Sequence, residues 1–130
     1  MIILTIRTDK PEAELGLYDD SKQLAYTTWL AHRELSETIH LRLRDILVAQ
    51  HKELHDLQGI VFFQGPGSFT GLRIGASVVN ALGEGVRAAI IGSVGEDWIQ
   101  QGINRLLAGE ADPLAIPEYG AAPNITAPRK

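Results

Sequence analysis

The stretch that decides the fold is residues 58–84, QGIVFFQGPGSFTGLRIGASVVNALGE. Gln58–Phe63 is almost wholly apolar, as expected of a strand covered on both faces. Three glycines and a proline in Gln64–Gly71 then exclude regular structure. From Leu72 to Glu84 the polar residues share one narrow arc at helical spacing, so this helix must be covered on more than one side. Those polar residues are Arg73, Ser77, Asn80 and Glu84.

The flanking segments predict the remaining elements. Apolar and alternating runs indicate three strands upstream of the stretch, and one strand and one helix downstream of it. The order β-β-β-α-β-α-β-α predicts a mixed sheet with helices packed on it. This is the layout of one lobe of the actin-like, ribonuclease H-like architecture, although periodicity alone also permits other α/β folds. The strands are predicted at Met1–Arg7, Ala13–Tyr18, Gln23–Leu30 and Val86–Gly92, and the downstream helix at Val94–Ala108.

A further helix is predicted at Glu34–Gln50, where the period changes from two to 3.6. Its main apolar face holds Leu35, Ile39 and Leu43, together with Ile46 and Leu47. Leu41 and Val48, seven residues apart, form a smaller stripe on the opposite side. One buried stripe is enough for packing on a sheet, so the second stripe indicates another contact.

The chain of 130 residues fits one domain. We expect residues 1–108 to form a single lobe. From Gly109 the character changes, because prolines punctuate a stretch rich in Ala, Gly and Asn. Residues 109–130 are therefore predicted to be an extended or disordered tail.

Composition excludes several classes of protein. There are no cysteines, which removes disulfides, thiolate nucleophiles and cysteine-ligated metal sites. The net charge is −4, so the chain lacks the excess of basic residues typical of a protein that binds nucleic acid without a partner. No apolar run approaches the roughly 20 residues of a membrane span. We therefore expect a cytoplasmic protein that makes no membrane contact.

The glycine-rich loop is the strongest candidate for chemistry, because it lies between a buried strand and a helix N-terminus. A Walker loop needs a Gly-Lys-Ser/Thr ending, and no lysine lies between Lys52 and Lys130. Gly65, Gly67 and Gly71 only loosely match a dinucleotide fingerprint. A structural tight turn is the preferred interpretation, and a nucleotide-binding or hydrolysing domain is the alternative.

The remaining candidate residues do not form a catalytic group. His51 and His55 have the spacing of a two-histidine metal site, but Lys52 stands where a zinc protease carries its glutamate base. A solvated helix end explains them more simply. Ser68 and Thr70 do not lie in a nucleophile elbow. Asp9, a possible magnesium ligand, is expected to be solvated. We therefore predict no catalytic, cofactor-binding or metal-ligating residue.

The segment Gly65–Gly75, GPGSFTGLRIG, resembles the signature of the bacterial TsaB (YeaZ) family over eleven consecutive residues. His32 and Glu34 are similar to the family's His-Ser-Glu stretch. Members usually begin with a strand ending Ile-Asp-Thr, whereas this chain has Ile6–Arg7–Thr8, so a cation replaces a carboxylate. The chain resembles a shortened member with a single lobe. The signature residues are Gly65, Pro66, Gly67, Ser68, Phe69, Thr70, Gly71, Leu72, Arg73, Ile74 and Gly75.

The resemblance implies a non-catalytic scaffold that pairs with the transferase TsaD, which forms threonylcarbamoyladenosine beside the tRNA anticodon. A TsaE-type ATPase joins the same assembly, and tRNA is met only through the complex. Pairing in the family uses the two helices next to the glycine-rich loop. The interface residues expected here are Leu35, Ile39, Leu43, Ile74, Val78, Ala81 and Leu82. Leu35 and Ile39 are expected to be exposed, although periodicity alone does not fix which of the set face the partner and which face the sheet. A self-associating homodimer is a further alternative.

Overall fold

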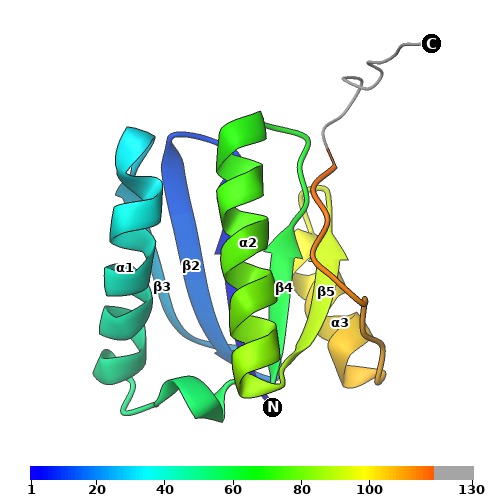
Figure 1. The fold of residues 1–130 in the computed structure, drawn as a ribbon. Coiled ribbons are helices and arrows are strands. Elements are labelled where there is room, and N and C mark those ends of the chain that lie inside the picture. Colours follow the sequence, from blue (N-terminus) through cyan, green and yellow to red (C-terminus); the bar gives the residue numbers. More distant parts are fainter. Residues whose placement is uncertain (119–130) are drawn as a thin grey trace, which may run out of the picture.

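The computed structural model describes residues 1–118, apart from the side chain of His32, and contains a five-stranded mixed sheet (Figure 1). The strands lie in the order β3-β2-β1-β4-β5, with β1–β3 as an antiparallel meander and β4 and β5 parallel to β1. The predicted mixed sheet and element order are confirmed. The strands are β1 (Ile2–Arg7), β2 (Glu12–Asp19), β3 (Lys22–Leu30), β4 (Gly59–Phe63) and β5 (Ala89–Ser93).

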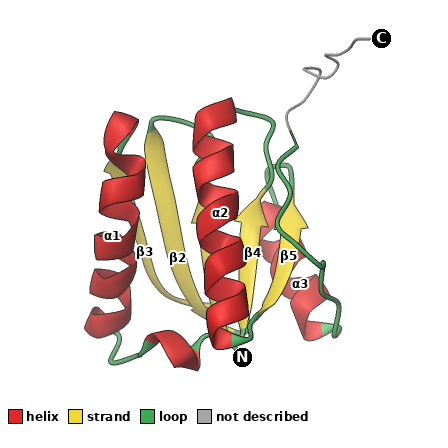
Figure 2. Cartoon of the chain, in the orientation of Figure 1, coloured by secondary structure: helices red, strands yellow, loops and turns green. Residues whose placement is uncertain are grey.

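Helices cover both faces of the sheet. Figure 2 shows α1 (Leu35–Ala49) and α2 (Phe69–Val86) in front of the sheet and α3 (Trp98–Leu107) behind it. Two short 3-10 turns, η1 (His32–Glu34) and η2 (Leu54–Asp56), lie at either end of α1. None of the helices within residues 1–118 has the length and apolar character needed to cross a membrane.

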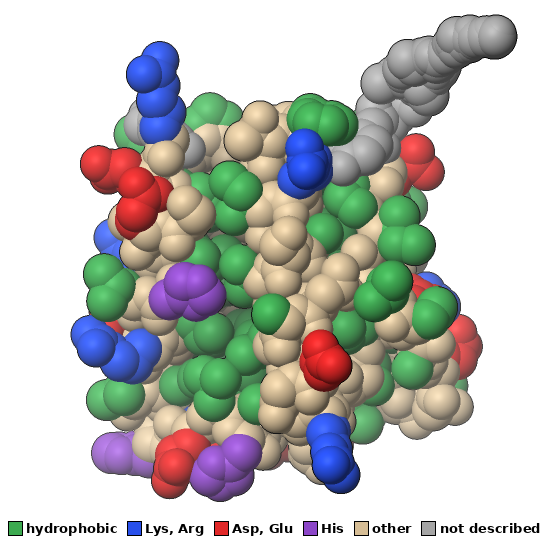
Figure 3. Space-filling model, in the orientation of Figure 1, with side chains coloured by type: hydrophobic (Ala, Val, Ile, Leu, Met, Phe, Trp, Pro, Cys, Tyr) green, Lys and Arg blue, Asp and Glu red, His purple; other side chains and the backbone are tan. Residues whose placement is uncertain are grey.

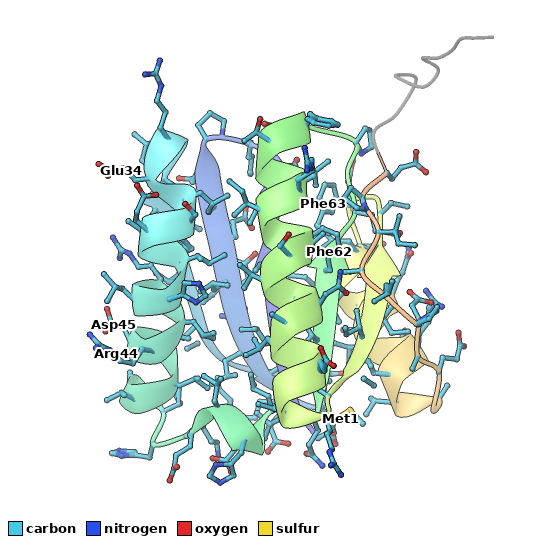
Figure 4. All side chains as sticks on the ribbon, viewed as in Figure 1. Met1, Glu34, Arg44, Asp45, Phe62 and Phe63 are labelled. Atoms are coloured by element: carbon cyan, nitrogen blue, oxygen red, sulfur yellow. The ribbon has the colours of Figure 1, made fainter. Side chains whose placement is uncertain are left out.

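Strand alternation divides the core into two parts. Along β1, Leu4 and Ile6 pack beneath α1 and α2, whereas Ile3 packs against the α3 side. On β4, Phe62 belongs to the first cluster and Phe63 to the second, and both are labelled beside α2 in Figure 4. Both faces of the central strands are therefore dry, as the apolar run of β4 predicts.

Element boundaries differ from the sequence-based expectations for local reasons. α2 begins at Phe69 rather than Leu72, because the Ser68 side chain accepts a hydrogen bond from the Gly71 N–H and caps the helix. The same helix runs on to Val86, and Arg87, which follows it, adopts a left-handed conformation. β5 consequently begins at Ala89 rather than Val86.

Residues 110–118, called the strap below, run back from α3 beside β5 and α2 (Figure 1). The Asp112 N–H donates to Ile90 O at 2.7 Å, and the Glu118 N–H donates to Gln64 O at 2.6 Å. The first part of the expected tail thus packs on the lobe, without helix or strand. Residues 119–130 lie outside the described residues, and the boundary predicted at residue 108 stays a prediction.

Candidate functional site: the surface of α1 and α2

The signature loop is packed onto the end of β1. The Ser68 N–H donates to Asp9 O at 2.8 Å, and the Thr8 hydroxyl donates to Gly71 O at 2.8 Å. A Cβ at Gly71 would lie 2.0 Å from the Thr8 carbonyl oxygen, which leaves room only for glycine. The loop therefore has a structural reason for its glycines, namely the close approach of the chain at Thr8 and Asp9.

Asp9 is buried beside this loop, which corrects the expectation that it is solvated. Its carboxylate accepts two hydrogen bonds from Arg7, at 2.8 and 3.2 Å. The Arg7 guanidinium also lies 3.9 Å from the ring centroid of Phe63. The Arg7 guanidinium, at the end of β1, is thus the counter-charge of the Asp9 carboxylate.

This arrangement opposes a phosphate at the loop. A Cβ built on Gly67 would lie 3.1 Å from Asp9 Oδ2, so the carboxylate already lies against the loop. A bound phosphate would place a second negative charge beside it. The Ser68 and Gly71 N–H groups, which would face such an anion, donate to Asp9 O and Ser68 Oγ instead. The geometry favours the structural turn over nucleotide chemistry.

The histidine pair does not form the metal site that its spacing would permit. His51 follows the end of α1 with a positive φ of 56°, and His55 lies in η2, so the two do not share a helical face. Among residues 1–118 there is no cluster of three or more His, Asp or Glu side chains arranged to hold a metal ion.

The expected interface residues of α1 are not exposed. Leu35 and Ile39 are only 5% and 1% exposed, and Leu43 is equally buried, because this stripe packs on the sheet. The expectation that Leu35 and Ile39 are exposed is therefore wrong. The smaller stripe of Leu41 and Val48 does face solvent. Asp45 lies on the outer side of α1 in Figure 4, and Arg44, labelled next to it, also lines a groove with Val78 of α2.

The expected interface residues of α2 lie at the surface. Ile74, Val78 and Leu82 are half-buried on the side that faces α1, and Ala81 is exposed on the crest of the helix. Figure 3 shows hydrophobic side chains gathered in a hollow between α1 and α2. The expected residues of α2 are therefore accessible, whereas those of α1 are buried and other residues of α1 lie at the surface. That the α2 residues contact a partner stays a prediction.

The hollow between the two helices consists of adjoining grooves, called the α1–α2 groove below. One groove of about 350 Å³ is lined by His40, Leu54, Val78, Ala81 and neighbours. A second of about 420 Å³ shares Val78 and reaches Thr70 and Arg73. Sequence periodicity missed His40 and Leu54, since a histidine on a polar arc and a leucine in a connecting turn carry no signal.

A further groove of about 650 Å³ continues this surface above α1, where it shares Thr70 and Ile74. Lys10 lines it and pairs with Glu14 at 2.8 Å. Burial opposes the charge on Glu14, but hydrogen bonds from Lys10 and the Tyr26 hydroxyl outweigh it and lower the pKa of Glu14. The Lys10 ammonium is thus neutralised within the chain.

Comparison with known proteins finds relatives of this chain. Residues 29–93 match the family model described as TsaD, tRNA N6-adenosine threonylcarbamoyltransferase. The chain is 32% identical over 114 residues to the tRNA threonylcarbamoyladenosine biosynthesis protein TsaB of Escherichia coli (strain K12), covering 83% of this chain and 49% of that protein. It is 33% identical over 98 residues to the tRNA N6-adenosine threonylcarbamoyltransferase of Burkholderia pseudomallei (strain 1106a), covering 63% of this chain and 28% of that protein.

Solved structures agree on the fold. YeaZ from Pseudomonas aeruginosa superposes with a TM-score of 0.67 at 24% identity, over 72% of this chain and 43% of that chain. RuvC from Thermus thermophilus gives a TM-score of 0.51 at 10% identity, over 86% of this chain and 84% of that one. Both likenesses show the shared actin-like, ribonuclease H-like fold alone. The chain spans about half the length of the TsaB relative and less of the transferase.

Proposed function

The chain belongs to the TsaB (YeaZ) family, and we propose that it is a non-catalytic subunit that docks on a TsaD-type transferase in the formation of threonylcarbamoyladenosine in tRNA. The α1–α2 groove is the proposed docking surface. A TsaE-type ATPase in the same assembly is part of the proposal on the family resemblance alone.

The observation that carries this proposal is the apolar floor exposed between two neighbouring helices. Two helices that lie side by side on a sheet usually close over each other, and here Val78, Ala81 and Leu54 line an open groove instead. Leu54 is 41% exposed there. Contiguous exposed apolar surface of this kind is typical of protein–protein contacts. Partner helices that pack into the groove would cover α2 on its second side.

The geometry of the glycine-rich loop supports the proposal that this subunit is non-catalytic. Asp9 is held by Arg7, and the signature glycines accommodate Thr8 and Asp9. The net charge of −4 further supports a subunit that meets tRNA only through its partner.

A charge placed on the crest of α2 tests the proposal. Ala81 is exposed, so Ala81→Glu should leave the fold intact, and a carboxylate buried at the contact should weaken binding by several kcal/mol, about 3 or more. Ala108→Glu, at an exposed alanine that caps α3 on the other side of the sheet, is the matched control.

The measurement is co-expression with the TsaD-type protein of the same organism, followed by size-exclusion chromatography with light scattering. We expect a heterodimer with the wild type and the control, and none with Ala81→Glu. A complex that survives Ala81→Glu unchanged would exclude this surface. A homodimer that does not exchange with the transferase would favour the self-associating alternative.

A further inference from the structure

The strap presents two large apolar side chains to solvent. Ala115 is buried at 4% exposure, whereas its neighbours Leu114 and Ile116 are 56% and 59% exposed. An extended chain points successive side chains to opposite sides, so fixing Ala115 inward turns both neighbours outward. The two exposed side chains are thus a consequence of how the strap is held.

Asn80 of α2 fixes that alternation. Its side chain accepts a hydrogen bond from the Ala115 N–H at 2.7 Å and donates one to Ala115 O at 3.1 Å. One amide side chain therefore satisfies both backbone groups of a single strap residue. The side chain of Gln64, the first residue of the glycine-rich loop, donates to Ile116 O at 3.0 Å. The strap is held in one register by α2 and by the glycine-rich loop.

Another groove, distinct from those between α1 and α2, separates the strap from the C-terminal half of α2. It has a volume of about 500 Å³ and is lined by Asn80, Ala81, Glu84, Leu114 and neighbours. Ala81 lines both this groove and the α1–α2 groove, so the two adjoin across the crest of α2. Figure 3 shows hydrophobic side chains on both sides of that crest.

The carboxylates that line this groove are Glu84 and Asp112. Glu110 and Asp112 of the strap both pair with Arg105 of α3, at 2.9 and 3.2 Å. Glu84 is exposed and makes no ion pair with any other described residue. Among the described residues that line this groove, Glu84 is thus the carboxylate left without a counter-charge, and it is complementary to a lysine or arginine.

We infer that the strap is part of the docking surface, and that Leu114 and Ile116 contact the same partner that occupies the α1–α2 groove. The occupant is an amphipathic helix of the transferase, with an apolar stripe over Leu114 and Ile116 and a cation opposite Glu84. The inference rests on the proposed function and adds the contacts of Leu114 and Ile116 to it. Asn80 is the positioning residue, because its hydrogen bonds to Ala115 orient these two side chains.

Leu114→Asp in the full chain tests the inference, with Leu107→Asp as the matched control. Leu107 is exposed to a similar degree, at 47%, but lies on α3 behind the sheet. Binding to the immobilised transferase is measured by interferometry, with circular dichroism on the same samples. We expect Leu114→Asp to raise the Kd at least about tenfold and Leu107→Asp to leave it within about twofold. Ile116→Asp provides an independent second variant should Leu114→Asp fail to fold.

The outcomes separate this inference from the proposed function. A wild-type chain that binds, with Ala81→Glu disrupting binding and both strap variants leaving the Kd within about twofold, overturns the role of the strap alone. A wild-type chain that does not bind the transferase overturns both. Loss of binding with the strap variants but not with Leu107→Asp supports the wider surface.

Discussion

At the scale of single residues, Glu14 makes the stability of the lobe depend on pH. Its folded-state pKa lies below the ordinary value of 4.5, because hydrogen bonds from Lys10 and Tyr26 outweigh the cost of burial. A carboxylate with a lowered pKa contributes stability above its unfolded pKa, and the contribution is lost as pH falls through the folded value. We expect Glu14→Gln to be less stable than the wild type at about pH 7 and to lose less stability between about pH 5 and pH 3. Urea unfolding at both ends of this range measures the free energy of unfolding of the two proteins. If that free energy falls in parallel for both proteins as the pH is lowered, the prediction is contradicted.

At the scale of elements, the glycines of α2 are predicted to differ sharply in their tolerance of alanine. A Cβ at Gly71 would meet the Thr8 carbonyl at 2.0 Å, so Gly71→Ala should destabilise the lobe by about 1–3 kcal/mol. Gly85 lies in the same helix, and nothing lies within 4 Å of its Cβ position. Gly85→Ala should therefore stabilise the lobe by about 0.5–1 kcal/mol through helix propensity. Thermal and urea unfolding of the two variants measure the contrast, and equal effects would show that the loop does not clamp β1.

The elements themselves follow from periodicity, and their contacts do so only in part. The buried run of β4 and the helical spacing of α2 are local patterns, and the structure confirms a buried strand and a helix there. The prediction that α2 is covered on more than one side stays a prediction. Periodicity assigns a residue to a face but does not say what covers that face. For this reason Leu35 and Ile39 were expected at a partner and lie on the sheet, whereas Leu54 lies in the groove. Asn80 looked like an ordinary polar position, because its partner Ala115 is 35 residues away in the sequence.

At the scale of the whole molecule, the two faces of the sheet differ in how their helices pack. Behind the sheet, α3 closes a core in which Phe63 and Trp98 meet edge to face at 5.5 Å. In front, α1 and α2 leave an apolar groove open, and the strap adds a second groove beside it (Figure 3). The front therefore presents two adjoining apolar grooves that a partner could cover.

Hydroxyl-radical footprinting of the chain alone and in complex with the transferase tests this account most directly. Leu54 in the α1–α2 groove and Leu107 on α3 are similarly exposed, at 41% and 47%, so each serves as a reference for the other. The account predicts that complex formation lowers the oxidation of Leu54 several-fold and leaves that of Leu107 unchanged. A complex that forms while Leu54 stays as reactive as before, with protection at Leu107 instead, would contradict it.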